Sequence, residues 1–478
     1  MPKKRTVRPI VKQRTASTPH PAAPRARIRE GLRLLRLLGS RASGLPSADM
    51  FTDGNDVMRW SAFRRHYVVS RSPRHVEQVF VEGYDTYQKA THYRLLATVT
   101  GEGLLTSEGE AWERQRRLIQ PVLGRRQIDG LVPAMVAATR GYLDRFAPPS
   151  PPEQVLLAEE MTEVTLDVVG SALFGSGLAH HIDRLRPAVT RGMSIALTSA
   201  RLQMMFGFSR RMIDVGGRLA RRLPLPPPLH RIRGVMATFD EVVTEIIEQR
   251  QQAGPGAAGD LLDLLLTVTD EHGEPMARNV IRDELITMML AGHETTANAL
   301  SWLWYLLSQN PDVYERHLEE VRNVLGNREP TAADIDRLVW TRACLEEAMR
   351  LYPSAWVLER EARFDTTLDG YAIPRKATII FLVHLIHRDA RWWNDPDEFR
   401  PERFLPAAAH PRRGTYLPFG AGRRVCVAAS FALTEGTLIA AMISQRHRFE
   451  RIDPRLPGES ATVTLRPADG LPMRVHPS

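Results

Sequence analysis

The stretch that decides the fold of this chain is Phe419-Gly420-Ala421-Gly422-Arg423-Arg424-Val425-Cys426. It places a cysteine just after a glycine-rich turn and just before a segment, Val427 to Glu435, that predicts the start of a helix. We therefore expect Cys426 at a helix N-terminus, where unpaired amides and the positive end of the helix dipole favour a thiolate over a thiol. The glycines let the backbone approach the sulfur closely, so that amide groups can tune a metal bound to it.

A lone thiolate in these surroundings indicates a metal ligand. Zinc takes several nitrogen or sulfur ligands, whereas a heme iron takes one thiolate in its axial position. Arg424, two residues before Cys426, supplies a cation that can pair with an anionic group beside the metal. The alternative is an inert cysteine packed in a glycine loop.

A second informative segment is Ala277 to Asn310, which lacks proline and predicts one helix about 50 Å long. Such a length is unusual in a globular domain and fits a helix that crosses the whole molecule. Its middle reads Ala291-Gly292-His293-Glu294-Thr295-Thr296. The small residues suit a face against which a flat cofactor and dioxygen can lie, and the Thr295 hydroxyl can open a groove in the helix.

Together these segments resemble the cytochrome P-450 family. The cysteine loop resembles its heme-binding signature, Ala291 to Thr296 its oxygen-activation motif, and Glu347 with Arg350 its E-x-x-R motif. The resemblance runs from roughly residue 50 to the C-terminus. It implies a single large heme domain over residues 26–478, mainly α with small β-sheets. Strand-like patterns fit this layout at Met58 to Ser70, Phe364 to Phe381 and Thr462 to Arg474, as does a helix that starts at Pro73.

The resemblance also assigns roles within the site. The cofactor would be heme b, with Cys426 as the ligand of its iron. Thr295 would organise dioxygen, and Glu294 would feed protons to it. The other cofactor contacts it implies are Trp112, Arg116, Ala291, Arg360, Phe419, Gly420 and Arg424. Trp112 and the three arginines would reach the heme propionates, because buried carboxylates require cations and hydrogen bonds.

Other residues receive structural roles. Glu347 and Arg350, three apart on a helix, would brace the heme-side core together with Arg403. Cys344 is interpreted as buried packing. We expect His293 and His387 to be hydrogen-bonded and not to bind a metal, because lone histidines are more often hydrogen-bonded than metal ligands. Solvated roles are expected for Arg114, Arg117 and Arg363, although each lies close in sequence to a predicted propionate contact.

Substrate contacts follow from the resemblance alone, with core packing as the alternative for each. They are His92 to Thr100, Met288, Met289, Ala291, Ser354 to Leu358, and Ala468 to Leu471. One departure from the family pattern is Ala428, since glycine usually stands two residues after the cysteine. We expect this methyl group to affect redox tuning more than ligation.

Composition sets the remaining bounds. The chain has 478 residues, 43% of them hydrophobic, and no apolar run approaches the ~20 residues of a membrane span. Its two cysteines and the lack of an anchor predict a soluble, cytoplasmic protein in a reducing compartment. Residues 1–25 are basic and rich in proline, which predicts disorder, with an organelle transit peptide as the alternative. Nucleic-acid binding is disfavoured because basic and aromatic residues do not alternate. A helix over Arg27 to Leu38 would dock on the domain or lie on a membrane surface.

The implied function is a heme-thiolate monooxygenase that oxidises an apolar small molecule (terpenoid, fatty-acid, steroid or polyketide-like) with dioxygen. Because the chain ends just after the heme domain, electrons are expected from separate proteins, an acidic ferredoxin or flavodoxin with its reductase. Pro396 to Phe404 resembles the branch that oxidises fatty acids and terpenoids. Two alternatives remain, a heme-thiolate peroxygenase or isomerase and a non-enzymatic heme sensor. The Glu294–Thr295 pair speaks against both, because neither needs such a proton relay.

Overall fold

The computed structural model describes residues 45–51, 55–62, 65–91, 93–146, 153–175, 227–254 and 259–478, with a few positions between 181 and 191. The predicted disordered tail and the helix expected over Arg27 to Leu38 lie outside these residues. Among the described helices, none is both long enough and apolar enough to cross a membrane.

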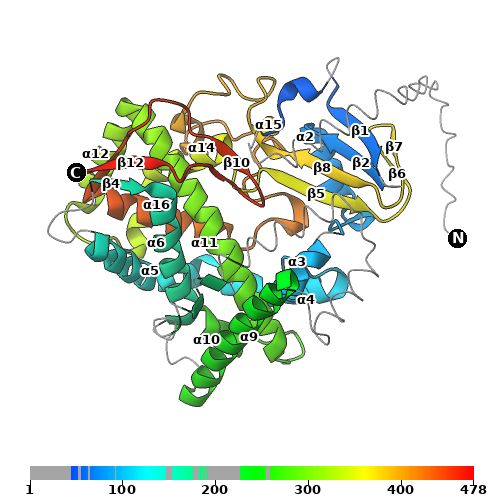
Figure 1. Cartoon of the computed structure of the whole chain (residues 1–478), viewed down its shortest axis with the longest axis horizontal. Coiled ribbons are helices and arrows are strands. Elements are labelled where there is room, and N and C mark those ends of the chain that lie inside the picture. Colours follow the sequence, from blue (N-terminus) through cyan, green and yellow to red (C-terminus); the bar gives the residue numbers. More distant parts are fainter. Residues whose placement is uncertain are drawn as a thin grey trace, which may run out of the picture.

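Helices form the larger part of the molecule and gather around one long central helix, α11 (Arg278–Gln309) (Figure 1). Three helices pack along its length, namely α6 (Leu157–Phe174), α14 (Val339–Leu351) and α16 (Ala429–Ser444). The other described helices are α2 (Pro73–Glu77), α3 (Tyr93–Thr100), α4 (Gly109–Val122), α5 (Arg125–Phe146), α9 (Pro227–Ala253), α10 (Leu261–Thr267), α12 (Pro311–Leu325), α13 (Ala332–Ile335) and α15 (Val383–His387).

Helix α11 confirms the prediction of a single helix across the molecule. Its second half is buried nearly all round, including Trp302 and Trp304, which are fully buried. Trp302 stacks on Tyr352, with 4.0 Å between ring centroids. Burying a large apolar side chain contributes about 2–3 kcal/mol, so this half is anchored strongly in the core. The helix ends at Gln309 because Pro311 has no amide to continue the hydrogen-bond ladder.

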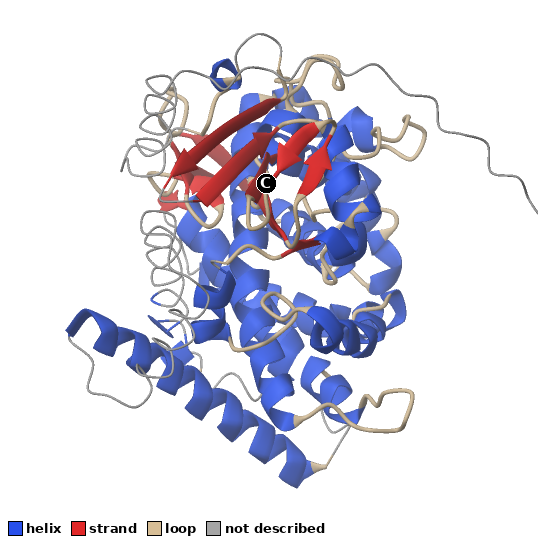
Figure 2. Ribbon diagram, turned by 90° about the vertical axis from the view of Figure 1, so that its right-hand side faces the viewer, coloured by secondary structure: helices blue, strands red, loops and turns tan. Residues whose placement is uncertain are grey.

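The strands lie mostly to one side of the helices (Figure 2). The largest sheet has the order β1-β2-β8-β5-β3 and joins segments from both halves of the chain. Its strands are β1 (Val57–Ala62), β2 (Arg65–Ser70), β3 (Tyr87–Gln88), β5 (Val357–Ala362) and β8 (Thr378–Leu382). Only β2 and β8 pair in parallel; the other pairs are antiparallel.

A second sheet and two hairpins complete the fold. The sheet has the order β4-β12-β9, and each hairpin consists of two short antiparallel strands. The strands are β4 (Gln154–Leu156), β9 (His447–Arg451) and β12 (Pro472–Pro477), then β6 (Thr366–Leu368) with β7 (Tyr371–Ile373), and β10 (Glu459–Ala461) with β11 (Leu465–Pro467). The predicted strand-like regions are therefore confirmed for β1, β2, β6, β7, β8, β11 and β12, whereas β3, β4, β5, β9 and β10 lie outside them.

Candidate active site

The cysteine loop is shaped by two glycines with positive φ. Gly420 has φ +76° and Gly422 has φ +67°, a region that side chains with a Cβ rarely adopt. A Cβ on Gly422 would also lie 1.9 Å from the carbonyl oxygen of Phe80. The loop is then closed by a hydrogen bond of 2.8 Å from the Cys426 amide to the carbonyl of Phe419. The glycines therefore serve the loop's conformation and its close approach to residues 78–82.

The predicted helix after the cysteine starts later than expected. Helix α16 begins at Ala429, with Ala428 as its N-cap, so Cys426 precedes the helix instead of capping it. The Ala428 backbone still forms a hydrogen bond that lowers the pKa of Cys426. Ala428 has φ −96°, which any residue adopts, so the alanine in place of the family's glycine strains nothing in the backbone.

The thiol of Cys426 lies on the floor of a recess. Its side chain is accessible to solvent, yet surrounding protein atoms raise its pKa by desolvation. A group on the open outer surface would not combine these two properties. The nearby Arg116 guanidinium opposes desolvation and lowers the pKa, so a positive charge is available to stabilise a thiolate.

One face of α11 is accessible in a region where the helix is otherwise buried. Met288, Ala291 and Thr295, spaced by three and four residues, lie on this face, and Ala291 is the most exposed of them. Gly292 points elsewhere, because a Cβ there would contact Val169 on α6 at 3.5 Å. The small residues therefore serve two purposes, since Ala291 borders open space and Gly292 lies at a helix crossing.

The predicted acid and alcohol both have defined partners. The Thr295 hydroxyl donates to the carbonyl of Ala291 at 2.8 Å. Glu294 accepts a hydrogen bond from the Thr464 hydroxyl at 2.5 Å. His293, directly before Glu294 in the sequence, is buried, and its Nδ1 lies 2.7 Å from the Met289 carbonyl oxygen. His293 is thus a hydrogen-bonded core residue, as expected.

A cluster of cations lies beside the cysteine loop. The Arg424 guanidinium carbon is 3.7 Å from the centroid of the buried Trp112 ring, and its nitrogen lies 2.9 Å from Glu108. Arg360 lies over Phe80, with 4.4 Å to the ring centroid. Arg116 donates to the carbonyl of Val425 at 2.8 Å. The structure thus brings the predicted propionate contacts to the two flanks of one loop.

These cations have too few anions around them. Burial lowers the pKa of Arg116, Arg360 and Arg424, and for Arg360 the charge of Arg424 lowers it further. An anionic ligand such as a pair of carboxylates would compensate for this excess of positive charge. The donor set, a recessed thiol beside clustered cations, therefore fits a heme with its propionates.

Lys89 belongs to the same cluster and was missed by the sequence analysis. It is buried, donates from Nζ to the carbonyls of Leu104 and Ser107, and its amide donates to Glu108. Burial, assisted by the charge of Arg424, lowers its pKa to about 6. No local pattern marks this lysine, because its neighbours come from other segments of the chain.

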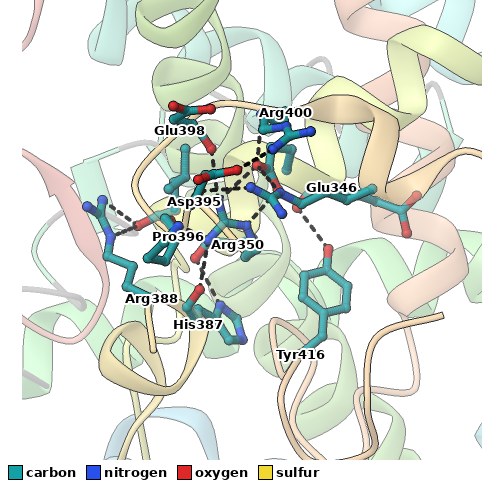
Figure 3. A network of polar contacts seen from close by, with 12 residues as sticks. Glu346, Arg350, His387, Arg388, Asp395, Pro396, Glu398, Arg400 and Tyr416 are labelled. Carbon is teal, nitrogen blue, oxygen red and sulfur yellow. Dashed lines mark hydrogen bonds and ion pairs between the residues drawn. The ribbon is translucent and has the colours of Figure 1, made fainter. Parts of the chain in front are cut away.

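Arg350 of the E-x-x-R pair lies in a network of polar contacts (Figure 3), and both Arg350 and Glu347 are fully buried. Arg350 donates to both carboxylate oxygens of Glu347, at 2.7 and 2.8 Å, and to the carbonyls of His387, Pro396 and Glu398. Arg403 also donates to Glu347, at 3.2 Å. Because one buried guanidinium donates hydrogen bonds to these three carbonyls, it holds the segment before the cysteine loop against α14.

His387 connects this network to the cysteine loop. Its Nδ1 lies 3.0 Å from the Arg350 carbonyl, and its Nε2 accepts a hydrogen bond from the Leu417 amide at 2.7 Å. The carbonyl requires a proton on Nδ1 and the amide requires none on Nε2, so the ring is neutral. Consistently, burial lowers the pKa of His387 to about 3.

The predicted substrate contacts separate into two groups. Met288 and Ala291 lie on the accessible face of α11, whereas Met289, Trp356 and Leu471 are buried in the core. Ser354 is also buried and donates to the Thr295 carbonyl at 2.8 Å. His92 lies outside the described residues. Core packing, the alternative reading, therefore accounts for several of these positions.

A helical body crossed by one long helix, with a recessed cysteine on a glycine loop beside clustered cations, defines a heme-thiolate protein. The chain belongs to the cytochrome P-450 family, whose model matches residues 47–469. Heme b is accordingly its cofactor, and the monooxygenases of this family are oxidoreductases.

Individual relatives agree with this assignment. The chain is 38% identical over 419 residues to cytochrome P-450 132 of Mycobacterium tuberculosis, covering 87% of this chain and 89% of the relative. It is 34% identical over 392 residues to cyclooctatin synthase of Streptomyces melanosporofaciens, covering 80% of each. The crystal structure of the cytochrome P-450DA heme domain superimposes with a TM-score of 0.76 at 26% identity, covering 88% of this chain and 89% of that one.

Proposed function

We propose that this chain inserts one atom of dioxygen into an apolar small molecule and reduces the other atom to water. The reaction converts a C–H bond to C–OH and consumes two electrons and two protons. The observation that carries the proposal is the acid–alcohol pair, Glu294 and Thr295, on α11, the long helix with an accessible face at Met288, Ala291 and Thr295. The heme supplies the oxidising chemistry when bound, and the protein supplies orientation, protons and exclusion of water.

The roles we propose follow from position. Cys426 would hold the iron, with Ala428 and Arg116 favouring its thiolate form. Arg116, Arg360, Arg424 and Trp112 would hold the propionates, with Phe419, Gly420 and Ala291 against the macrocycle. Thr295 would present its hydroxyl to dioxygen after release from the Ala291 carbonyl, and Glu294 would deliver protons.

Among apolar substrates we favour a terpenoid. Cyclooctat-9-en-7-ol 5-monooxygenase, whose name denotes a cyclic unsaturated alcohol, shares 31% identity with this chain, and carotene epsilon-monooxygenase, whose name denotes a terpenoid hydrocarbon, shares 29%. Met288 and Ala291 on the accessible face of α11 are apolar and offer no ion pair to a polar substrate. A terpene and fatty-acid panel, screened for a shift of the Soret band on binding, would separate this class from fatty-acid and steroid alternatives.

For electrons we propose an acidic ferredoxin or flavodoxin that docks near the cysteine loop. Arg412, Arg413 and Arg423 are exposed there. Arg423 is partly offset by Glu113 at 3.4 Å, whereas Arg412 lies over Trp392 at 4.4 Å from the ring centroid. The positive charge of this face thus rests mainly on Arg412 and Arg413. The cytoplasmic location stays a prediction.

Substituting the alcohol tests the monooxygenase proposal. We expect Thr295→Ala to bind heme normally and to divert oxygen to hydrogen peroxide, because protons no longer reach dioxygen in order. Product formed per reduced nicotinamide consumed should fall by about tenfold or more. Thr296→Ala, whose hydroxyl instead bonds the buried Glu435, is the matched control. An unchanged product ratio in Thr295→Ala would favour the peroxygenase, isomerase or sensor alternatives.

A further inference from the structure

The carboxylate of Glu294 on α11 accepts a hydrogen bond from a residue outside its own helix. Thr464, on the turn between β10 and β11, donates to Glu294 across 170 positions of sequence, with 2.5 Å between Oγ1 and Oε1. Its side chain is buried. A separation this short is typical of a hydroxyl donating to an ionised carboxylate. In the part of the chain that the structure describes, Glu294 accepts no other hydrogen bond.

The turn itself is fixed to the same stretch of α11. The Leu465 amide donates to the Ser354 carbonyl at 3.0 Å, and the Ser354 hydroxyl donates to the Thr295 carbonyl at 2.8 Å. These contacts run from Glu294 through Thr464, Leu465 and Ser354 back to Thr295. The position of the Thr464 hydroxyl relative to the acid–alcohol pair is therefore set by several bonds at once.

Two tryptophans add to this attachment. Trp302 of α11 donates from Nε1 to the Leu465 carbonyl at 3.3 Å. Trp356 donates to the Thr462 carbonyl at 3.0 Å. Both rings are buried, so they hold the turn on either side of Thr464 with little freedom to move.

A glutamate side chain has three rotatable bonds, and proton delivery requires it to point in one direction. We propose that Thr464 is a positioning residue that holds the Glu294 carboxylate in the orientation from which it delivers protons. This inference rests on the proposed function of Glu294. Thr464 itself supplies no proton, so the two protons of the reaction still enter through Glu294.

The test compares Thr464→Val, Thr464→Ser, Glu294→Gln and the double variant Glu294→Gln/Thr464→Val. Valine keeps the shape of threonine without the hydroxyl, and serine keeps the hydroxyl. The heme-loaded proteins receive electrons from an acidic ferredoxin and its reductase, with the terpene hydrocarbon limonene as the apolar probe. The rate of nicotinamide oxidation, the peroxide released per nicotinamide, and the ratio of rates in water and deuterium oxide are measured.

We expect Thr464→Val to slow nicotinamide oxidation about tenfold, to raise the peroxide yield and to increase the solvent isotope effect, whereas Glu294→Gln slows it about a hundredfold. Thr464→Ser should behave as the unmodified protein. The double variant should be no slower than Glu294→Gln, because the hydroxyl acts only through the carboxylate.

The outcomes separate the two proposals. If Glu294→Gln has no effect, the proposed role of Glu294 fails. If Glu294→Gln is impaired but Thr464→Val is not, or if the double variant is slower than Glu294→Gln, the positioning role of Thr464 is overturned while the proposed function stands. An intact Soret band establishes that each variant is folded, and Thr464→Ala replaces Thr464→Val if the valine variant loses it.

Discussion

At the scale of single residues, the two cysteines differ in their access to solvent and in the groups that oppose desolvation. Cys344 is fully buried, and burial raises its pKa well above the usual range of a thiol. Cys426 is accessible, with the Ala428 backbone and the Arg116 charge opposing its desolvation. Although desolvation raises the pKa of both thiols, only Cys426 is reachable by a metal from solvent, and we propose that it is the ligand.

Replacing each cysteine separately tests which one is the ligand of the heme iron. Cys426→His should lose the far-red Soret band of the reduced carbon monoxide complex, because that band requires a thiolate on the iron. Cys344→Ser should keep the band and lose only some stability, about 1 kcal/mol, from a changed core position. A band abolished by Cys344→Ser and retained by Cys426→His would overturn the ligand assignment.

Arg116 and Arg360, whose partners Val425 and Phe80 are distant in the chain, were predicted only through the family resemblance, whereas other predicted residues have their neighbours close in the chain. Gly420, Gly422 and Cys426 form one loop, and Glu347 with Arg350 form one helix turn. Lys89 and Thr464 could not be predicted. Their partners, the Ser107 carbonyl and Glu294, come from segments that only the tertiary fold brings together.

At the scale of elements, His387 joins α14 to the cysteine loop. His387 is the last residue of α15. Its Nδ1 donates a hydrogen bond to the carbonyl of Arg350 near the end of α14, and its Nε2 accepts a hydrogen bond from the amide of Leu417, just before the glycine turn. One neutral ring therefore satisfies two buried backbone groups and transmits the rigidity of the Glu347–Arg350 network to the loop (Figure 3).

Removing this ring should loosen the loop. We expect His387→Phe, which keeps the volume, to leave both backbone groups unsatisfied and to lower the free energy of unfolding by about 2–4 kcal/mol. Part of the far-red band of the reduced carbon monoxide complex should be lost. Urea unfolding and the carbon monoxide spectrum measure the two effects. The control His384→Phe, in the same helix, removes a bond to the Pro46 carbonyl instead and should leave the spectrum unchanged.

Helices α11 and α16 are joined by a buried acid. Glu435 is fully buried and accepts from the Thr296 hydroxyl at 3.0 Å. Burial raises its pKa to about 8, while the bond to Thr296 opposes the rise. Its Oε1 has no partner among the described residues. The carboxyl is therefore protonated in the folded protein at neutral pH.

Because burial raises the pKa of Glu435, the free energy of unfolding is expected to fall as pH rises. Between about pH 4.5 and pH 8 the folded state holds a proton that the unfolded state has released, so stability is greatest at low pH and falls as pH rises through this window. The slope is at most about 1.4 kcal/mol per pH unit. Glu435→Gln should remove this contribution. Unfolding free energies measured from pH 5 to 9 should therefore converge at pH 5 and favour the variant at pH 8; parallel curves would contradict the assignment.

Element boundaries show where the sequence stops being informative. The proline-free segment Ala277 to Asn310 predicted both ends of α11 to within one residue. Pro311 explains the C-terminal end, because proline cannot continue the helix. The start of α16 was wrong by two residues, since the turn after Cys426 has no capping side chain to mark it. Strands β3 and β4 are two and three residues long, and only their partner strands β5 and β12 define them.

At the scale of the whole molecule, charge is distributed unevenly. The chain carries a formal net charge of +9. Around the cysteine loop, Arg424 is held inward by Glu108 and Arg423 is partly offset by Glu113, which leaves Arg412 and Arg413 as the exposed cations. We therefore propose that an acidic electron donor is attracted to the side of the molecule that carries Arg412 and Arg413.

The salt dependence of electron transfer tests this docking face. Attraction between surface charges is screened beyond about 8 Å at physiological salt and acts mainly on the association rate. Stopped-flow reduction by an acidic ferredoxin should therefore slow as salt rises. Arg412→Glu combined with Arg413→Glu should slow it at low salt by about tenfold and flatten the salt dependence.

Two controls separate a docking face from a general effect of net charge. Arg375→Glu with Arg466→Glu changes the net charge by the same amount at exposed positions on the β7–β8 turn and on β11. This pair should alter the rate far less, because attraction at the docking face depends on local charge. Deletion of residues 1–25, which removes several basic residues, should likewise have little effect. Equal slowing by both arginine pairs would assign the attraction to the whole molecule, and a rate indifferent to salt and to both pairs would exclude electrostatic docking at this face.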